Sequence, residues 1–520
     1  MRKLLFALSA LFAVTLYGGE EIALGEKDFI LGELELAGGK YSVKCDNGIF
    51  TIDIPVQVGI SNETRGAVFN IPLKNLKGKG VQIRGEVRFE NITTEGNPHA
   101  GGKILAYNGK NGLKNFFVSP TLRGTQNEWQ PIMLACEFPA DIDDAQIVLG
   151  IQQGWGKLQF RNMRIEEFPI APIITVKLPE NFKCQYTDRV TKNIARRGVM
   201  SPVWSRLSEK DIEDLASWNV NLIRYQIVDG NVNVLDIDAY EKWFNRAIDN
   251  IEKLMPLLEK YDIQVIIDMH HVLGGRCGSK FKSDRKLDPS HFVIMESDTY
   301  RDAFVRLWQN TAKRLKGNKQ VYAFDLCNEP IQHGQAKHSF WQVQYEAAKA
   351  SREVDPEVPI MVESNHMANP NFFEMEAMDL PNIIYSVHMY APGDYTHQGV
   401  NDTSYTKQFY AKRYDYRDSG WDRARLALSM DAVRKFEKKY GAKIQVGEFS
   451  VAIWAPGGAD YLNDLISIFE EYKWDWTYHA FREWEGWSLE HEGTPDAIVK
   501  AQQPTERLKV MLKYWQKNKQ

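Results

Sequence analysis

Hydrophobic positions change their spacing along this chain, and the change divides the sequence into two regions. From about residue 20 to 170, short runs of alternating apolar and polar residues are separated by Gly, Asn and Pro. Clear examples are GIFTIDIPV, GVQIRGEVRF and KLQFRNMRIEEF at 48–56, 80–89 and 157–168. Alternation with a period of two is typical of strands buried on one face. We therefore predict an all-β, jelly-roll-like sandwich over residues 20–170.

The second region, residues 195–520, alternates apolar runs with long segments of helical periodicity. Apolar residues form one stripe from Tyr240 to Leu258, where we expect Pro256 to kink the last turn. A second stripe runs from Tyr300 to Leu315, behind a Ser297/Asp298 cap. Eight apolar runs indicate strands, at 196–204, 221–228, 264–270, 321–329, 359–364, 383–390, 443–450 and 476–484.

Eight strand–helix repeats predict an α/β fold, a (β/α)₈ TIM barrel whose strands are buried on both faces. The main alternative is a doubly wound sheet, which usually carries a Gly-rich nucleotide-binding turn after an early strand. No such turn occurs in this sequence. The segment 171–194, which follows Pro169 and contains Pro172 and Pro179, is interpreted as the connection between sandwich and barrel.

Residues 1–19, MRKLLFALSALFAVTLYGG, have the pattern of a signal peptide. Two basic residues precede an apolar run that is short for a membrane span of about 20 residues, and small residues follow it. An uncleaved membrane anchor is the alternative reading. We expect a secreted, periplasmic or cell-surface protein, with no second segment of spanning length.

Composition excludes several classes of function. A formal net charge of −4 over 520 residues provides no basic surface for nucleic acids. Five Cys, an odd number without C-x-x-C spacing, indicate neither a disulfide framework nor a zinc ribbon. The Asp268–His271 run lacks the H-x-H or H-E-x-x-H partners of a hydrolytic zinc site, so we expect no metal and no cofactor. The sequence does not fix the oligomeric state, for which we expect a monomer.

Polar residues end most of the predicted barrel strands, and barrels of this kind hold their active sites at the carboxyl ends of the strands. These residues are Arg224, His270, His271, Asn328, Glu329, Glu363, His388, Tyr390 and Glu448. Cleavage of a glycosidic bond needs one carboxylic acid to protonate the leaving oxygen and a second carboxylate to attack carbon or activate water. Glu329 and Glu448 are the best candidates. Glu363 is a third functional carboxylate or a structural one, with equal weight.

The ordered motifs of this region resemble glycoside hydrolase family five, the cellulase and mannanase group of retaining (β/α)₈ hydrolases. The motifs are Asp268-Met269-His270, Asn328-Glu329-Pro330, His388-Met389-Tyr390 and Gly447-Glu448, within roughly residues 195 to 515. The resemblance implies that Glu329 is the acid/base and Glu448 the nucleophile of a double displacement. It also implies that the substrate-binding residues are Arg224, His270, Asn328, His388 and Tyr390.

The sequence departs from this family at the end of the eighth strand, where the family usually has a tryptophan beneath the reacting sugar. His479 falls there instead, and Trp484 or Trp487 is the candidate replacement; Trp484 is assigned to the substrate-binding residues. The leading function is an endo-β-1,4-glucanase, with a mannanase or another β-glucanase as the alternative. A non-catalytic glycan-binding surface protein and a transglycosylase are the competing hypotheses.

The predicted sandwich resembles a carbohydrate-binding module in its arrangement. Trp129 and Trp155 are its candidate sugar platforms. Packing of these two rings in a purely structural domain is an equally good interpretation.

Overall fold

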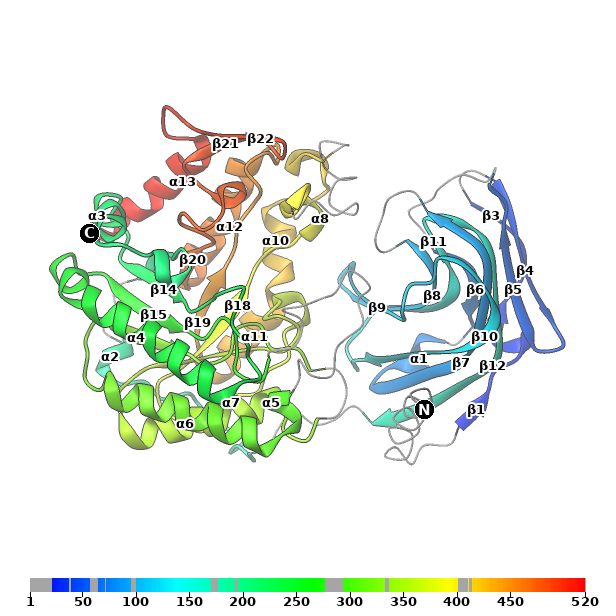
Figure 1. Cartoon of the computed structure of the whole chain (residues 1–520), viewed down its shortest axis with the longest axis horizontal. Coiled ribbons are helices and arrows are strands. Elements are labelled where there is room, and N and C mark those ends of the chain that lie inside the picture. Colours follow the sequence, from blue (N-terminus) through cyan, green and yellow to red (C-terminus); the bar gives the residue numbers. More distant parts are fainter. Residues whose placement is uncertain are drawn as a thin grey trace. The chain divides into compact units, whose positions relative to one another are not determined.

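The computed structural model of the 520-residue chain (Figure 1) divides into two compact units, with the boundary between Ala171 and Pro172. The described residues are 21–36, 39–56, 64–70, 72–94, 100–169, 176–191, 195–275, 293–332, 336–400, 410 and 414–519. The predicted signal peptide lies outside them. No helix among the described residues is long and apolar enough to cross a membrane.

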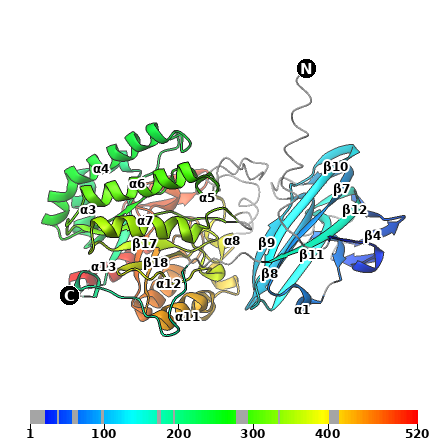
Figure 2. The ribbon, with the colours of Figure 1, turned by 90° about the horizontal axis from the view of Figure 1, so that it is seen from below.

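The N-terminal unit consists of two antiparallel sheets, which Figure 2 shows as separate layers. The first sheet has the order β10 (Gly124–Phe138), β7 (Lys79–Thr94), β12 (Gly154–Pro169), β5 (Ile49–Ile54), β4 (Gly39–Asp46), β3 (Gly32–Leu36), with β1 (Glu21–Ala23) paired to β12. The second has the order β2 (Phe29–Ile30), β6 (Thr64–Phe69), β11 (Asp144–Gln152), β8 (Gly101–Lys110), β9 (Leu113–Val118). The described part of the unit also contains two short helices, η1 (Glu26–Asp28) and α1 (Leu73–Leu76).

Alternating side chains explain why the two sheets share one core. In β7, Val81, Ile83, Val87 and Phe89 are buried, while the residues between them are partly exposed. Apolar residues of β5 and β11 join the same core from the two sheets. The N-terminal unit is therefore all-β, as the period-two pattern predicted.

The C-terminal unit is a closed barrel of eight parallel strands, which confirms the predicted fold class. In order they are β13 (Arg197–Met200), β14 (Leu222–Gln226), β15 (Gln264–Asp268), β16 (Val321–Asp325), β17 (Ile360–Glu363), β18 (Ile383–His388), β19 (Lys443–Glu448) and β20 (Asp475–Tyr478). Pairing of β13 with β20 closes the ring. The last strand is shorter than the predicted run 476–484 and ends just before His479.

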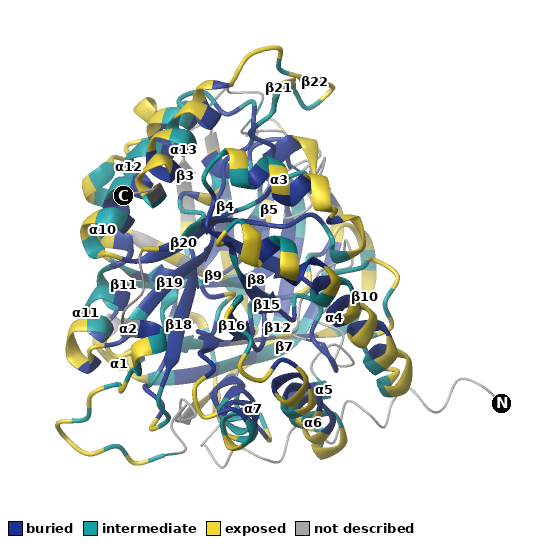
Figure 3. Cartoon of the chain, turned by 90° about the vertical axis from the view of Figure 1, so that its left-hand side faces the viewer, coloured by how far each residue is buried: buried dark blue, intermediate teal, exposed yellow. Residues whose placement is uncertain are grey.

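Helices surround the barrel, with buried faces toward the strands and exposed faces outward (Figure 3). They are α2 (Asp188–Thr191), α3 (Glu209–Ser217), α4 (Ile237–Lys260), α5 (Val293–Glu296), α6 (Asp298–Arg314), α7 (Phe340–Val354), α8 (Gly393–Thr396), α10 (Arg423–Ser429), α11 (Asp431–Tyr440), α12 (Gly458–Tyr472) and α13 (Glu506–Trp515). Shorter elements are η3 (Trp204–Arg206), η5 (Pro370–Phe372), η7 (Tyr416–Asp418), η8 (Glu485–Trp487), η9 (Gln516–Lys519), β21 (His491–Thr494) and β22 (Ala497–Lys500). Between β17 and β18 the fully described connection contains η5 and no α-helix.

The two helices predicted from periodicity are α4 and α6. Helix α4 continues past Pro256 to Lys260, so the proline does not end it. Helix α6 begins directly after Ser297, as predicted, but the Ser297 side chain accepts no capping hydrogen bond. The four described cysteines, Cys45, Cys136, Cys184 and Cys327, form no disulfide with one another.

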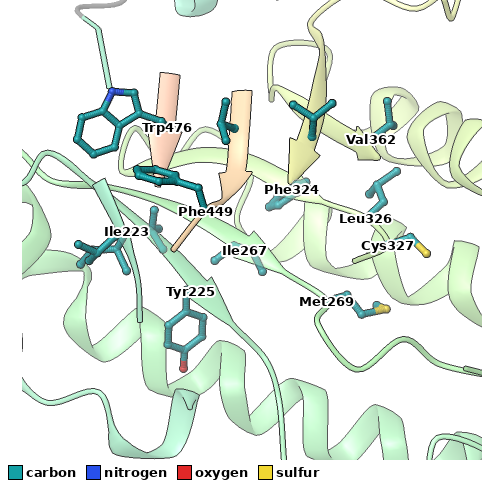
Figure 4. Close-up of a cluster of buried hydrophobic side chains, with 14 of the residues drawn as sticks. Ile223, Tyr225, Ile267, Met269, Phe324, Leu326, Cys327, Val362, Phe449 and Trp476 are labelled. Atoms are coloured by element: carbon teal, nitrogen blue, oxygen red, sulfur yellow. The ribbon is translucent and has the colours of Figure 1, made fainter. Parts of the chain in front are cut away.

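Side-chain alternation along the barrel strands separates two environments. Residues such as Ile223, Tyr225, Ile267 and Phe324 belong to the large core shared with the helices (Figure 4). The intervening residues form a small apolar cluster of their own: Leu222, Ile266, Tyr322, Ala323, Met361 and Ile384. Two positions further along four of these strands stand Arg224, Asp268, Asp325 and Glu363, all fully buried. Because strand side chains repeat every two residues, these charged groups share the barrel interior with the apolar cluster, on its carboxyl-terminal side.

Candidate active site

Seven of the eight predicted site residues gather at the carboxyl ends of the strands. They are Arg224 in β14, His270 beyond β15, Asn328 and Glu329 beyond β16, His388 in β18, Tyr390 beyond it, and Glu448 in β19. His271, which the sequence offered beside His270, instead accepts a hydrogen bond from the backbone N–H of Asp229 at 3.4 Å. Trp484 lies apart from this group.

Glu448 is held on both of its oxygens. Arg224 Nη1 donates to Oε1 at 2.7 Å, and the Tyr390 hydroxyl donates to Oε2 at 3.0 Å. His388 Nδ1 lies 3.7 Å from Oε2, and His270 Nδ1 lies 3.9 Å from Oε1. Burial by itself raises the pKa of Glu448, but the positive charges of His388 and Arg224 outweigh it and hold the pKa well below its usual value. Glu448 is therefore ionised at neutral pH.

Glu329 occupies a different position. Its φ of 48° lies in the left-handed region, which is unfavourable for a residue other than glycine, and Pro330 follows it. Its Oε1 contacts His388 Nδ1 at 2.9 Å. Its side chain is 16% exposed, against 6% for Glu448. One ligand atom each of Glu329, His388 and Glu448 lies within 4.8 Å of the others, so the two carboxylates nearly meet.

Glu363 links the two glutamates through their neighbours. Its Oε2 accepts the backbone N–H of Glu329 at 2.6 Å, which holds the left-handed residue in place. Its Oε1 accepts from Arg224 Nη2 at 3.0 Å and lies 3.1 Å from His388 Nε2. Of the two interpretations left open by the sequence, these contacts favour a positioning role for Glu363.

Arg224 is surrounded by four carboxylates. The nearest nitrogen–oxygen distances are 3.2 Å to Asp268, 2.8 Å to Asp325, 3.0 Å to Glu363 and 2.7 Å to Glu448. One guanidinium cannot neutralise four buried anions. Burial raises the pKa of Asp325 well above its usual value, and Glu363 and Asp268 add to this rise although Arg224 opposes it. Asp325 therefore holds its proton more tightly than an ordinary aspartate does.

Asn328 and His270 are oriented by this cluster. Asn328 Oδ1 accepts from Arg224 Nη2 at 2.9 Å, so the amide nitrogen points away from the arginine. Among the described residues, that nitrogen has no hydrogen-bond partner although it is buried. His270 Nδ1 lies 2.9 Å from Asp268 Oδ2, which fixes the imidazole ring next to Glu448. Both side chains keep a polar nitrogen for a further contact.

His479 follows the eighth strand, at the position where a tryptophan was expected. Its Nδ1 lies 2.8 Å from the Tyr390 hydroxyl and its Nε2 lies 2.7 Å from Glu483 Oε2. Trp487 packs beside this pair, with ring centroids 6.4 Å from Tyr390 and 5.9 Å from His479. His479 thus places polar atoms where the family has an aromatic ring.

Trp484 does not pack against the catalytic group itself, as was predicted for the tryptophan beneath the reacting sugar. Trp487 is the ring that packs against Tyr390, and Trp484 packs against Trp487. It packs against Trp487 and Trp454 at 5.6 and 5.9 Å and is 36% exposed. Trp487, which contacts Tyr390, is the tryptophan that reaches the catalytic group. Trp487 therefore lies next to the catalytic group, and Trp484 provides the exposed ring.

Three participants were not singled out from the sequence. Asp325 interrupts the apolar run VYAFDL, which is a visible signal for a buried charge. Glu483 and His397 carry no comparable signal, because each lies in a loop. Burial, with a contribution from His479, lowers the pKa of His397 to about 4, so this ring is neutral at pH 7.

Glu329, His388 and Glu448 are also the one group among the described residues whose atoms are close enough to hold a metal ion. Direct contacts between the three side chains account for this spacing, since His388 Nδ1 lies 2.9 Å from Glu329 and 3.7 Å from Glu448.

The family model for cellulase (glycosyl hydrolase family 5) matches residues 187–482. The chain belongs to glycosyl hydrolase family 5. It is therefore a glycoside hydrolase, as the ordered motifs predicted. The match begins at residue 187 and leaves the N-terminal sandwich outside the family 5 region.

Two relatives are about a quarter identical to the chain over the aligned residues. Endoglucanase C of Acetivibrio thermocellus is 25% identical over 295 residues, covering 51% of this chain and 81% of that protein. Cellodextrinase A of Ruminococcus flavefaciens is 26% identical over 276 residues, covering 52% and 72%. The structure of Thermotoga maritima Cel5A with cellobiose is 16% identical with a TM-score of 0.46, covering 61% of this chain and 96% of that one.

Proposed function

We propose that this family 5 enzyme is an exported endo-β-1,4-glucanase that cleaves its substrate with retention of configuration. The short distance between the two glutamates carries the proposal. Retaining hydrolases have their carboxyl groups about 5–5.5 Å apart, and inverting enzymes about 6.5–9.5 Å. One oxygen of Glu329 and one of Glu448 lie within 4.8 Å of each other, which is closer than the separation of an inverting pair.

In the first step Glu448 attacks the anomeric carbon while Glu329 gives its proton to the leaving oxygen. The bond to the leaving sugar breaks and an ester between Glu448 and the sugar forms. The ionised state of Glu448 suits attack, and the greater exposure of Glu329 suits contact with the departing sugar. In the second step Glu329 takes a proton from water, which attacks the same carbon and releases Glu448.

The residues around the pair bind the reacting sugar. The unpartnered amide nitrogen of Asn328 donates to the hydroxyl next to the anomeric carbon, a bond that strengthens in the transition state. Tyr390 and Arg224 hold Glu448 on its two oxygens, and His388 orients Glu329. His270 is positioned by Asp268 to reach a sugar hydroxyl.

The names of the relatives support a β-1,4-glucan as substrate, since they are an endoglucanase and a cellodextrinase. Exposed Trp484 beside Trp454 gives a ring for the apolar face of a further sugar unit. The polar His479 in place of an aromatic floor keeps mannan and other β-glucans as the second candidates. Export rests on the signal-peptide pattern of residues 1–19.

For the N-terminal sandwich we propose glycan binding on the outer face of the seven-stranded sheet. There the ring of Trp129 is stacked by Arg88 at 4.7 Å and Arg161 at 4.3 Å. Arg88 also donates to Gln159, so guanidinium and amide groups lie beside the ring. Trp155 packs partly against the core and is a weaker candidate. A Trp129→Ala variant should bind insoluble cellulose less well; unchanged binding would favour a purely structural sandwich.

The decisive experiment combines a substrate screen with two variants. Reducing-sugar release is measured on cellulose, mixed-linkage glucan, xyloglucan, mannan, and β-1,3- and β-1,6-glucans. Glu329→Gln should lose about 10²–10⁴-fold of the activity on the preferred polymer, the usual contribution of a general acid. Glu448→Ala should abolish turnover, and azide should restore part of it with a product of inverted configuration.

Glu485→Gln is the matched control, because Glu485 is exposed and lies outside the catalytic group. Wild-type product of inverted configuration would overturn the retaining mechanism. Full activity of Glu329→Gln would overturn the assignment of the acid. Product analysis at high acceptor concentration separates hydrolysis from transglycosylation, which uses the same residues.

A further inference from the structure

Tyr390 stands between two groups that compete for its single phenolic proton. Its hydroxyl lies 3.0 Å from Glu448 Oε2 and 2.8 Å from His479 Nδ1. On the far side of the imidazole, His479 Nε2 lies 2.7 Å from Glu483 Oε2. A carboxylate, an imidazole and a phenol therefore lead in a line to the proposed nucleophile.

The protonation state of His479 decides where the phenolic proton goes. If His479 is neutral and keeps its proton on Nε2 toward Glu483, Nδ1 can only accept, and it draws the proton of Tyr390 away from Glu448. If His479 carries both ring protons, Nδ1 donates to the phenol oxygen. Tyr390 can then donate only to Glu448.

We propose that Glu483 and His479 form a positioning pair that keeps the Tyr390 proton directed at Glu448. Through this bond the pair keeps Glu448 ionised and oriented for attack. The inference rests on the proposed role of Glu448 as nucleophile. It gives the polar residue at the end of the eighth strand a function that a tryptophan cannot have.

The charges around the pair favour the doubly protonated ring. Burial lowers the pKa of His479, but Glu483 outweighs it, with smaller contributions from Glu448 and Glu329, and the pKa is raised. Burial raises the pKa of Glu483, but His479 and His270 outweigh it, and that pKa is lowered. Carboxylate and imidazolium thus stabilise each other, as expected for a close and partly buried ion pair.

The other titratable groups facing His479 come from four elements. They are Tyr390 beyond β18, Glu448 at the end of β19, Glu329 beyond β16, and His397 after α8. His270, beyond β15, acts on Glu483 and Glu448. The pKa of His397 is lowered to about 4 by burial and by His479, so His397 does not compete for the positive charge at neutral pH.

The first test follows kcat/KM against pH on 2,4-dinitrophenyl β-cellobioside. Dinitrophenolate leaves without a proton from Glu329, so the acidic limb of the profile reports the ionisation of Glu448. Glu483→Gln and His479→Phe should move this limb to higher pH by about one unit, a roughly tenfold loss below the limb. The plateau at neutral pH should change much less. Glu483→Gln is the nearly isosteric variant, and Glu485→Gln, two residues away and exposed, is the control.

The second test needs no substrate. Ring nitrogen signals of the histidines in the full chain are titrated by NMR, and the signal lost in His479→Phe identifies His479. In the wild type it should titrate above the ordinary histidine value of about 6.5, and in Glu483→Gln at lower pH. If His479 is neutral at pH 6, or if its pKa is the same in Glu483→Gln as in the wild type, the proposed positioning pair is overturned.

The two tests separate this inference from the proposed function. If the wild type does not cleave the cellobioside, the glucanase proposal fails, while the NMR titration still decides whether Glu483 holds His479 protonated. If the NMR result is as expected but the acidic limb stays in place in both variants, the pair does not act on Glu448. That outcome overturns the inference while leaving the hydrolase intact.

Discussion

The two units of this enzyme both pair arginines with carboxylates from other strands, but in opposite surroundings. In the sandwich, Arg161 and Glu86 meet at 2.9 Å on the outer face of a sheet, with 36% and 35% of their side chains exposed. In the barrel, Arg224 meets Asp268, Asp325 and Glu363 with no exposure on either side. Water and salt weaken the first pair, whereas the second must compensate for lost hydration by close contacts. A network of charges that a fold keeps buried indicates function more strongly than exposed ion pairs on the surface of a sheet do.

Removing the two arginines should give the largest contrast. Arg224→Met leaves several carboxylates buried without a cation and should destabilise the barrel by about 3–5 kcal/mol, with loss of activity. Arg161→Met, on the sandwich, should leave both unfolding and turnover of a soluble oligosaccharide unchanged within error. Denaturant unfolding followed by fluorescence, together with turnover on that soluble substrate, measures both effects. Equal destabilisation by the two variants would break the comparison.

Carboxylate-to-amide substitutions test the same comparison through catalysis. Glu363→Gln retains the shape but weakens the bonds to Arg224 and to the backbone N–H of Glu329. Because misplacement by about 1 Å can cost about 100-fold, we expect kcat to fall by 10- to 100-fold with KM little changed. Glu86→Gln, the counterpart in the sandwich, should leave kcat at the wild-type value. A loss confined to KM would assign Glu363 to substrate binding instead.

The pH dependence of Glu448 in the barrel and of Glu86 in the sandwich distinguishes their two environments. The pKa of Glu448 is held well below its usual value although burial opposes this, and the pKa of Glu86 is lowered chiefly by its hydrogen bond to Arg161. Each ionised carboxylate therefore stabilises the fold above its unfolded pKa, and this contribution is lost as the pH falls through the folded pKa. Activity on the dinitrophenyl substrate should persist below about pH 4.3, the ordinary glutamate value.

Raising the salt concentration separates the exposed carboxylate from the buried one. At 1 M the Debye length shrinks to about 3 Å, so the carboxyl pKa of Glu86, followed by NMR, should move back toward its ordinary value. The acidic limb of the activity profile should stay in place. A limb that shifts with salt as much as Glu86 does would show that water reaches the barrel cluster.

Aromatic substitutions give the smallest expected effect. Trp484→Ala should raise KM for long cello-oligosaccharides about fivefold, the equivalent of about 1 kcal/mol for one stacked ring, with kcat unchanged. Trp129→Ala should leave KM for soluble oligosaccharides unchanged. Initial rates on cellotriose to cellohexaose measure both. An equal change for every chain length would place Trp484 against the reacting sugar.

The sequence predicted the barrel because a purely local signal is repeated eight times. Each strand is an apolar run, and most of the runs end in a polar residue, so the sequence alone placed Arg224, Glu329 and Glu448 at one mouth of the barrel. The change from period-two alternation to apolar runs between helical segments separated the sandwich from the barrel. Periodicity gives no comparable signal for the connection after β17, which contains η5 and no α-helix.

What the sequence could not predict are contacts that depend on three dimensions. Nothing in the motif Asn328-Glu329-Pro330 shows that the backbone of Glu329 is left-handed and held by Glu363, more than 30 residues away. The partner of His479 was hidden for the same reason, because Glu483 lies in a loop without periodicity. Trp484 was assigned to substrate binding from its nearness to the eighth strand, whereas Trp487 is the ring that reaches Tyr390.

The raised pKa of Asp325 has a consequence for how this barrel can diverge. A neutral carboxyl group and an amide have almost the same shape, and each offers one donor side and one acceptor side. Position 325 should therefore tolerate an exchange of Asp for Asn better than position 448, where the carboxylate pairs with Arg224 and its pKa is held well below its usual value. Variation among homologues inside the barrel should follow the protonation state of each acid more closely than its depth of burial.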